Sequence, residues 1–189
     1  IYASDLKYSK KTTNIIWAVW VLFQIGLLFY TEYMLTNLQL QFYTGFVLAL
    51  VGQYVIYFLT TKGKFTQRLF TILTYSIFFC IAMAFFSMVK GSMGETYPVL
   101  TAIIHFTLLF CADFYLLWYV CPLCRAAEKN ITTGWVSLIV VNVVFMITII
   151  FSSVYPTRLT GFSDPSVIPF VFLSISIMAV YPVIFRSIN

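Results

Sequence analysis

Six apolar stretches, each close to the length that a helix needs to cross a bilayer, constrain the fold of this 189-residue chain more than any other feature. About 20 apolar residues in a helix span the roughly 30 Å of membrane hydrocarbon. Only 9% of the residues are charged, against about 25% in a soluble domain. The stretches are Asn14–Tyr30, Phe42–Thr60, Leu69–Met88, Pro98–Val120, Ile131–Ser152 and Val167–Phe185. They predict an all-α, polytopic membrane protein built as a bundle of six transmembrane helices.

The connections between the stretches are short, and none is long enough for a separate domain. Residues 1–13 are polar and basic, and we expect them to form a cytoplasmic segment ahead of one six-helix transmembrane domain over residues 14–189. The first apolar stretch lacks a small-residue cleavage site, so no cleavable signal peptide is expected.

Basic residues are distributed unevenly between the two sides of the predicted bundle. Nine of the 11 lysines and arginines fall on the amino terminus, the even-numbered connections and the carboxyl terminus, and only Lys90 and Arg158 fall on the other side. Because loops rich in Lys and Arg stay in the cytoplasm, this bias predicts that both termini are cytoplasmic. The net charge of +5 then follows from topology, so no nucleic-acid partner is expected. We expect a multi-pass protein of an endomembrane or of the plasma membrane.

The stretch Pro98–Val120 carries His105 and Asp113, the only residues in the six stretches that can hold a charge at neutral pH. A charge at the centre of a membrane helix costs about 2.5–3.5 kcal/mol on insertion scales, so such groups are usually functional. His105 can act as a general base, or it can bond a facing hydroxyl for packing. Asp113 lies about 12 Å further along the helix and roughly 80° around it, so it cannot touch His105. A protonated or paired carboxyl is the favoured interpretation of Asp113.

Thr44 is the third candidate site residue. The second and fourth stretches both run from the outer to the inner side, with Thr44 about two residues deep and His105 about seven residues deep. Helix tilts of about 20° can close the resulting axial offset of about 7–8 Å. A threonine hydroxyl activated by a histidine is a nucleophile–base pair.

Small and polar residues inside the stretches predict how the helices pack. Gly45, Ala49 and Gly52 recur at helical spacing and predict a face that a neighbouring backbone approaches closely. Pro182 is expected to bend or end the sixth helix. We expect the uncharged polar residues to hydrogen-bond between helices: Gln24, Gln53, Asn142, Ser174 and Ser176.

The segment Cys121-Pro-Leu-Cys124 is expected to end the fourth helix on the cytoplasmic side. A CxxC pair can perform redox chemistry or offer half of a zinc site. There is no second CxxC, and the single histidine lies far along the helix. We therefore expect no metal and no cofactor, and favour reduced or reversibly acylated thiols.

Three segments carry a resemblance to a known family: QFYTGFVLALVGQ (Gln41–Gln53), ETYPVLTAIIHFTLLF (Glu95–Phe110) and VYPTRLTGFSDPSVIPF (Val154–Phe170). They resemble the androgen-induced and androgen-dependent TFPI-regulating proteins, six-helix membrane hydrolases of fatty acid esters of hydroxy fatty acids. The first segment is similar to the stretch around that family's nucleophilic threonine, and the second to the stretch before its active-site histidine. The third is similar to the family's loop into the last helix. The resemblance implies a nucleophilic role for Thr44 and an active-site role for His105.

The resulting hypothesis is an integral-membrane lipid-ester hydrolase whose partners are membrane lipids and a lipid-ester substrate. Thr44 would attack the ester carbonyl, and His105 would take its proton and return it to the leaving alkoxide. The alternative is a non-catalytic structural subunit of a larger membrane complex, whose partners are other membrane subunits. A small transporter or channel is a weaker alternative, because a transport pathway usually needs more ionisable groups or broken helices.

Overall fold

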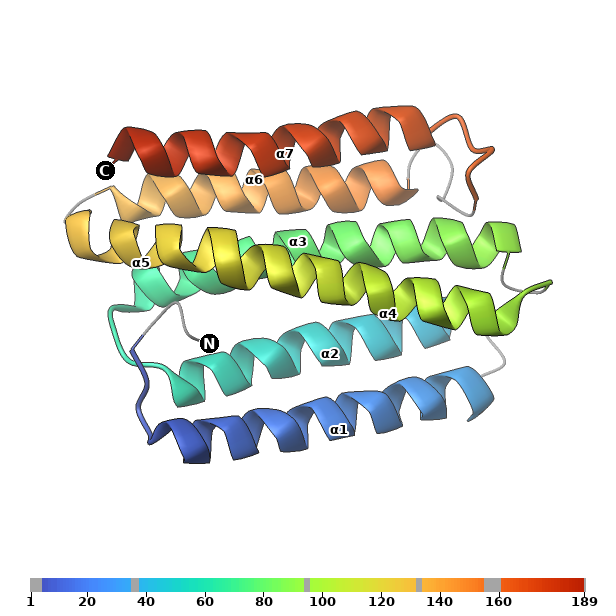
Figure 1. Ribbon diagram of the computed structural model, residues 1–189, viewed down its shortest axis with the longest axis horizontal. Coiled ribbons are helices and arrows are strands. Elements are labelled where there is room, and N and C mark those ends of the chain that lie inside the picture. Colours follow the sequence, from blue (N-terminus) through green and yellow to red (C-terminus); the bar gives the residue numbers. More distant parts are fainter. Residues whose placement is uncertain (1–4, 35–37, 94–95, 132–133, 155–160, 189) are drawn as a thin grey trace. The chain divides into compact units, whose positions relative to one another are not determined.

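The computed structural model describes residues 5–34, 38–93, 96–131, 134–154 and 161–188. Over these residues the chain is all-α, as predicted, apart from one isolated antiparallel bridge between Leu6 and Thr61. The helices in Figure 1 are α1 (Lys10–Met34), α2 (Leu38–Thr60), α3 (Phe65–Met93), α4 (Pro98–Tyr115), α5 (Cys121–Asn130), α6 (Trp135–Val154) and α7 (Val167–Ile188), with a π-helical turn, η1 (Leu116–Val120), between α4 and α5.

The chain divides into two compact units, Ile1–Arg68 and Leu69–Asn189, and the division falls in the first turn of α3. The first unit contains α1, α2 and the connection to α3. The second contains the rest of α3 and all later helices. Each unit is described by itself.

In the first unit, α1 and α2 pack against each other as an antiparallel pair. Trp17 in α1 donates from Nε1 to Thr60 Oγ1 at the end of α2 (3.3 Å). Trp20, one turn later in α1, packs on Gly52, two turns earlier in α2. The two contacts advance in opposite directions along the two helices, as an antiparallel pair requires.

The segment before α1 is tied to the end of α2. Lys7 N–H donates to Thr60 O (2.9 Å), and Lys62 N–H donates to Asp5 O (2.6 Å). Ser9 Oγ then accepts the backbone N–H three residues further on (3.2 Å). This serine caps the helix, so α1 begins four residues before its predicted start.

Gly52 leaves the space that the indole ring of Trp20 occupies. A methyl group added to Gly52 would lie 2.8 Å from Trp20 Cζ3 and closer still to two other ring carbons. The prediction that a neighbouring backbone approaches this position is wrong for Gly52, because the indole ring of Trp20 occupies the space instead. Gly45 and Ala49, predicted to share this face, lie outside the residues whose side chains are described.

We expect Gly52→Ala to lower the thermal unfolding midpoint of the purified chain, because overpacking against a rigid ring typically costs about 1–3 kcal/mol. For a chain of this size, about 1 kcal/mol corresponds to about 2–4 °C. Gly26→Ala in α1 is the matched control, since no described atom lies within 4 Å of the added carbon. Alanine is the better helix former by roughly 0.5–1 kcal/mol, so the control should not be less stable. Equal losses in both variants would contradict the Trp20 contact.

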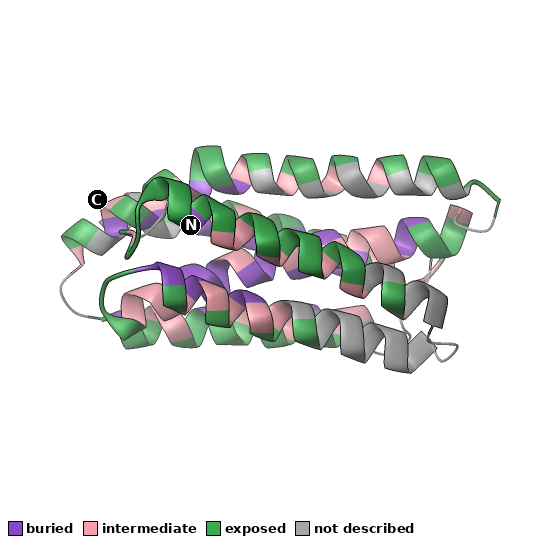
Figure 2. Ribbon diagram, turned by 90° about the horizontal axis from the view of Figure 1, so that it is seen from below, coloured by how far each residue is buried: buried purple, intermediate pink, exposed green. Residues whose placement is uncertain are grey.

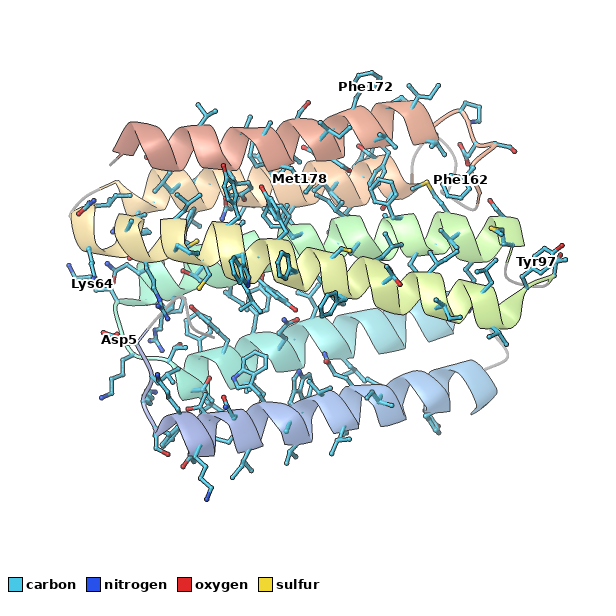
Figure 3. The ribbon with its side chains drawn as sticks, in the orientation of Figure 1. Asp5, Lys64, Tyr97, Phe162, Phe172 and Met178 are labelled. Carbon is cyan, nitrogen blue, oxygen red and sulfur yellow. The ribbon has the colours of Figure 1, made fainter. Side chains whose placement is uncertain are left out.

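In the second unit, α3 supplies the core. Phe70 near its start contacts Trp135 at the start of α6, with ring centroids 5.6 Å apart. Phe85, four turns later, contacts Phe170 in α7, also at 5.6 Å. α6 and α7 run side by side in Figure 1 and pack together, and α5 packs on α7. Tyr115 at the end of α4 donates to the Met178 carbonyl in α7 (3.3 Å), so α4 is held within the same unit (Figure 3).

The fourth predicted helix continues past its expected end at Val120. α4 passes into the π turn η1, where Cys121 N–H bonds to Leu116 O, and then into α5, which ends at Asn130. The expectation that the CxxC segment ends a helix is wrong, because it begins α5. Pro122 lies in the first turn of α5, where its missing N–H does little harm. In the π turn before it, a backbone N–H bonds the carbonyl five residues earlier, and this wider turn carries the backbone from α4 into α5.

The loop into α7 is described from Gly161 onward, and hydrogen bonds hold it there. Phe162 N–H donates to Ser92 Oγ near the end of α3 (2.9 Å), and Figure 3 labels Phe162 in this loop. Asp164 Oδ1 accepts Ser166 N–H (2.9 Å), which closes the turn before the helix. The Tyr155-Pro156 pair of the predicted loop lies outside the described residues.

Among the described residues, two helical segments are long and apolar enough to cross a membrane, namely α3 and Trp135–Ser153 of α6. Leu50–Thr60 and Val167–Tyr181 are apolar over a shorter length. Within the 18-residue apolar stretch of α3, 67% is buried, as in the core helix of any protein. In the corresponding stretch of α6, only 11% is buried. Exposed positions recur along individual helices in Figure 2. Extended apolar surface of this kind is unfavourable in water, so the exposed face of α6 points to a surrounding membrane.

Candidate functional site

The residues that the sequence predicts for the site lie on α2 and α4. Thr44 is the seventh residue of α2, His105 is the eighth of α4, and Asp113 lies near the end of α4. α2 belongs to the first unit and α4 to the second. The side chains of Thr44, His105 and Asp113 lie outside the part of the structure that is described.

The described neighbours of His105 define two faces of α4. Ile103 and Phe110 are 57% and 71% exposed, whereas Leu108 and Ala112 are half-buried.

The described residues of α2 that follow Thr44 include exposed apolar side chains. Leu48, Val51 and Val55 are 48%, 55% and 52% exposed.

Two threonines in the described helices, the exposed Thr107 and the half-buried Thr148, show how a hydroxyl is satisfied within this chain. Thr107 in α4 donates to Ile103 O (2.8 Å), and Thr148 in α6 donates to Val144 O (2.7 Å). Each hydroxyl bonds the carbonyl four residues earlier in its own helix, which satisfies it without a second helix.

The CxxC segment lies in the first turn of α5. Cys124 is 2% exposed, and Cys121 is half-buried. Across the described parts of the chain, no group of three or more His, Cys, Asp or Glu side chains gathers as in a metal site.

The structure reveals a buried polar network that links α3, α6 and α7. Asn142 Nδ2 in α6 donates to Thr74 Oγ1 (2.8 Å) and to Phe70 O (3.2 Å) in α3. Tyr181 in α7 donates its hydroxyl to Asn142 Oδ1 (2.7 Å). Thr74 and Asn142 are 1% exposed and Tyr181 is 2% exposed. Three helices are thus joined through one amide at a place that water does not reach.

This network confirms one packing expectation and corrects two others. Asn142 bonds between helices, as predicted. Ser174 and Ser176 do not, because each donates to the carbonyl four residues earlier in α7 (2.8 and 2.7 Å). Both N–H bonds of Asn142 are used within this network.

Sequence reasoning missed Thr74 and Tyr181. The position of Tyr181 carried a signal, because a phenol inside an apolar span and away from its ends needs a hydrogen-bond partner. The ring of Tyr181 also contacts Phe78 in α3 and Phe145 in α6, with centroids 5.5 and 6.1 Å apart. Tyr181 therefore joins these helices through both apolar and polar contacts.

No protein-family model, no curated protein and no solved structure matches the chain. Its function is accordingly inferred from its own residues.

Proposed function

We propose that this chain is a multi-pass integral-membrane protein with six membrane spans and both termini in the cytoplasm. The outward-facing apolar surface of α6 carries this proposal, together with the nine-to-two bias of basic residues. The spans are α1, α2, α3, α4 with η1, α6 and α7. The short helix α5 carries Arg125 and Lys129 and lies on the cytoplasmic side in this topology.

Labelling of single cysteines in intact cells tests this topology. In a background whose four native cysteines are replaced by serine, we expect Lys90→Cys to react with a membrane-impermeant maleimide from outside. Lys64→Cys should react only after the membrane is permeabilised, because the bias of basic residues places it in the cytoplasm. Both positions are exposed, so access to the reagent depends on the side of the membrane. Labelling of Lys64→Cys in intact cells would refute the proposed orientation.

We further propose that the chain is a lipid-ester hydrolase in which Thr44 is the nucleophile and His105 the general base. The similarity of Gln41–Gln53 and Glu95–Phe110 to the hydrolase segments supports this assignment. A chain that is 61% hydrophobic suits a substrate that dissolves in the bilayer.

The proposed reaction is an acyl transfer in two steps. Thr44 Oγ attacks the ester carbonyl while His105 takes the hydroxyl proton, and His105 then protonates the leaving alkoxide. Water next attacks the acyl-threonine with His105 again as base, which releases the fatty acid and restores the hydroxyl. The test is turnover of long-chain esters by the purified chain in phosphatidylcholine nanodiscs, with mass-spectrometric mapping of a fluorophosphonate label to Thr44.

A second candidate is a non-catalytic subunit of a larger membrane complex. In such a subunit a threonine hydroxyl can be satisfied within its own helix, as those of Thr107 and Thr148 are. Large apolar side chains such as Phe172 (68% exposed, Figure 3) offer surface to lipid or to partner helices. This candidate predicts neither ester turnover nor labelling of Thr44.

A further inference from the structure

Six basic residues gather at one end of the first unit, and we call them the basic cap: Lys7, Lys10, Lys11, Lys62, Lys64 and Arg68. Asp5 is the one acidic residue in the same two segments, residues 5–13 and 60–68. The rest of the chain carries five basic and five acidic residues, because the whole chain has 11 and six. The basic cap and Asp5 therefore account for the entire formal net charge of +5.

Hydrogen bonds join the two segments of the basic cap, which are about 50 residues apart in the sequence. Lys7 N–H bonds Thr60 O and Lys62 N–H bonds Asp5 O, on either side of the bridge between Leu6 and Thr61. Asp5 and Lys64 lie at the same end of the unit in Figure 3. The lysines are thus brought together by backbone structure in spite of their mutual repulsion.

Arg68 fixes the connection beneath the lysines. Its Nη1 donates to Phe58 O (3.1 Å) and to Thr61 O (3.2 Å), and its guanidinium carbon lies 4.9 Å from the centre of the Phe58 ring. Gly63 makes the turn between α2 and α3 with φ of 113°, a conformation that favours glycine. Arg68 therefore positions the turn. The five lysines of the basic cap are exposed, and the Lys7 ammonium also donates to Phe58 O (3.4 Å). The exposed ammonium groups can meet an anionic ligand.

Two aromatic side chains lie beside these lysines in the sequence and are also exposed. Tyr8 is 49% exposed and Phe65 is 61% exposed, and Phe65 stacks on Phe58 with ring centroids 5.3 Å apart. Aromatic residues next to lysines are typical of the boundary between hydrocarbon and headgroups. This mixture favours a lipid headgroup over a fully aqueous polyanion such as nucleic acid.

Positive-inside topology alone does not require such a concentration of charge. On α5, which is also cytoplasmic in the proposed topology, Arg125 and Lys129 flank Glu128 in the sequence, so part of their charge is compensated. The basic cap has only Asp5 against six cations. Clusters of four to eight Lys and Arg beside a membrane helix attract anionic lipids by about 1 kcal/mol per residue.

We propose that the basic cap is a binding site for the phosphate-bearing headgroups of anionic phospholipids in the cytoplasmic leaflet. The proposal rests on the membrane insertion proposed above and is independent of any hydrolase activity. Several phosphates on one headgroup would engage several ammonium groups at once, while Tyr8 and Phe65 would lie at the edge of the hydrocarbon.

Binding of a fluorescent short-chain phosphatidylinositol bisphosphate to the full chain in neutral detergent micelles tests the site by fluorescence anisotropy. The substituted chain carries Lys10→Gln, Lys62→Gln and Lys64→Gln, which leave Arg68 and the backbone bonds in place. Three lysines at about 1 kcal/mol each predict affinity about 100-fold weaker than that of the native chain. Binding by the native chain should also weaken as salt is raised, because these charges are exposed.

The matched control removes the same charge elsewhere, through Lys90→Gln, Arg125→Gln and Lys129→Gln, all at exposed positions. We expect the control chain to bind the lipid as the native chain does. Equal weakening in both chains would overturn the site in favour of a general effect of net charge. No binding by the native chain would overturn it outright.

Competition distinguishes the lipid from other phosphates. We expect phosphatidylserine to compete, and inositol trisphosphate, inorganic phosphate and a single-stranded oligonucleotide to compete poorly. A free inositol phosphate or an oligonucleotide that bound as tightly as the lipid would refute a headgroup site at the membrane. Reconstitution in neutral phosphatidylcholine nanodiscs tests membrane insertion separately, so a chain that inserts but ignores anionic lipid contradicts this inference alone.

Discussion

Thr44→Ala and His105→Ala are each expected to abolish ester turnover while leaving the chain folded. The first change removes the nucleophilic oxygen, so no acyl-enzyme can form. The second removes the general base, whose contribution is typically about 100- to 10,000-fold in rate. Because the two residues act as one unit, the double variant should be hardly slower than either single one. The measurement is hydrolysis of a fluorescent long-chain ester by purified chains in nanodiscs.

Thr107→Ala is the matched control for these variants. Its hydroxyl bonds the Ile103 carbonyl within α4, so its loss should leave turnover unchanged. A fluorophosphonate probe should label the native and control chains at Thr44, and labelling should fall in His105→Ala. If the folded native chain takes no label and cleaves no long-chain ester, the hydrolase proposal is wrong. The structural-subunit alternative then stands.

Asn142→Leu is expected to be the most destabilising of the substitutions considered for the second unit. Leucine is close to asparagine in size, so the change removes hydrogen bonds without opening a large cavity. It removes three hydrogen bonds in an almost fully buried part of the second unit, namely those that Asn142 Nδ2 donates to Thr74 Oγ1 and Phe70 O and the one that Asn142 Oδ1 accepts from Tyr181. A hydrogen bond of this kind contributes about 0.5–1.5 kcal/mol net. Three such bonds predict a loss of about 2–4 kcal/mol, or a thermal midpoint lower by about 5–10 °C.

Ser174→Ala is the control for this loss. Ser174 is also 1% exposed, but its hydroxyl bonds the carbonyl of Phe170 in its own helix, so only a minor change is expected. Tyr181→Phe completes a double-mutant cycle with Asn142→Leu. The two changes should be less than additive, with a coupling energy of about 0.5–3 kcal/mol, because they remove the same hydrogen bond. Strict additivity would show that Tyr181 and Asn142 are not partners.

The sequence by itself determined the all-α class and the position of every predicted helix core. Apolar stretches of membrane length can satisfy their backbone groups only within a helix, and this requirement is local. Local signals also marked Asn142 as a polar residue in need of a partner. For the site, the sequence identified His105 as a rare ionisable group and, through a family resemblance, Thr44.

Helix ends were harder to predict because they depend on capping and on single turns. The Ser9 cap moved the start of α1 outward, and the π turn before Pro122 carried the fourth helix on into α5. In the same way, α7 continues through Pro182 to Ile188, although this proline was expected to bend or end it. These outcomes depend on a few backbone hydrogen bonds that composition does not encode.

Only the tertiary structure decided which residues meet across long sequence separations. Asn142 bonds Thr74, 68 positions earlier, and Tyr181, 39 positions later. The ring of Trp20 fills the space above Gly52, and two distant lysine segments form one basic cap. Hydropathy and helical period fix how far along a helix a residue lies and on which face. They do not fix which neighbouring helix that face contacts, because partner choice depends on the combined packing of side chains from several helices.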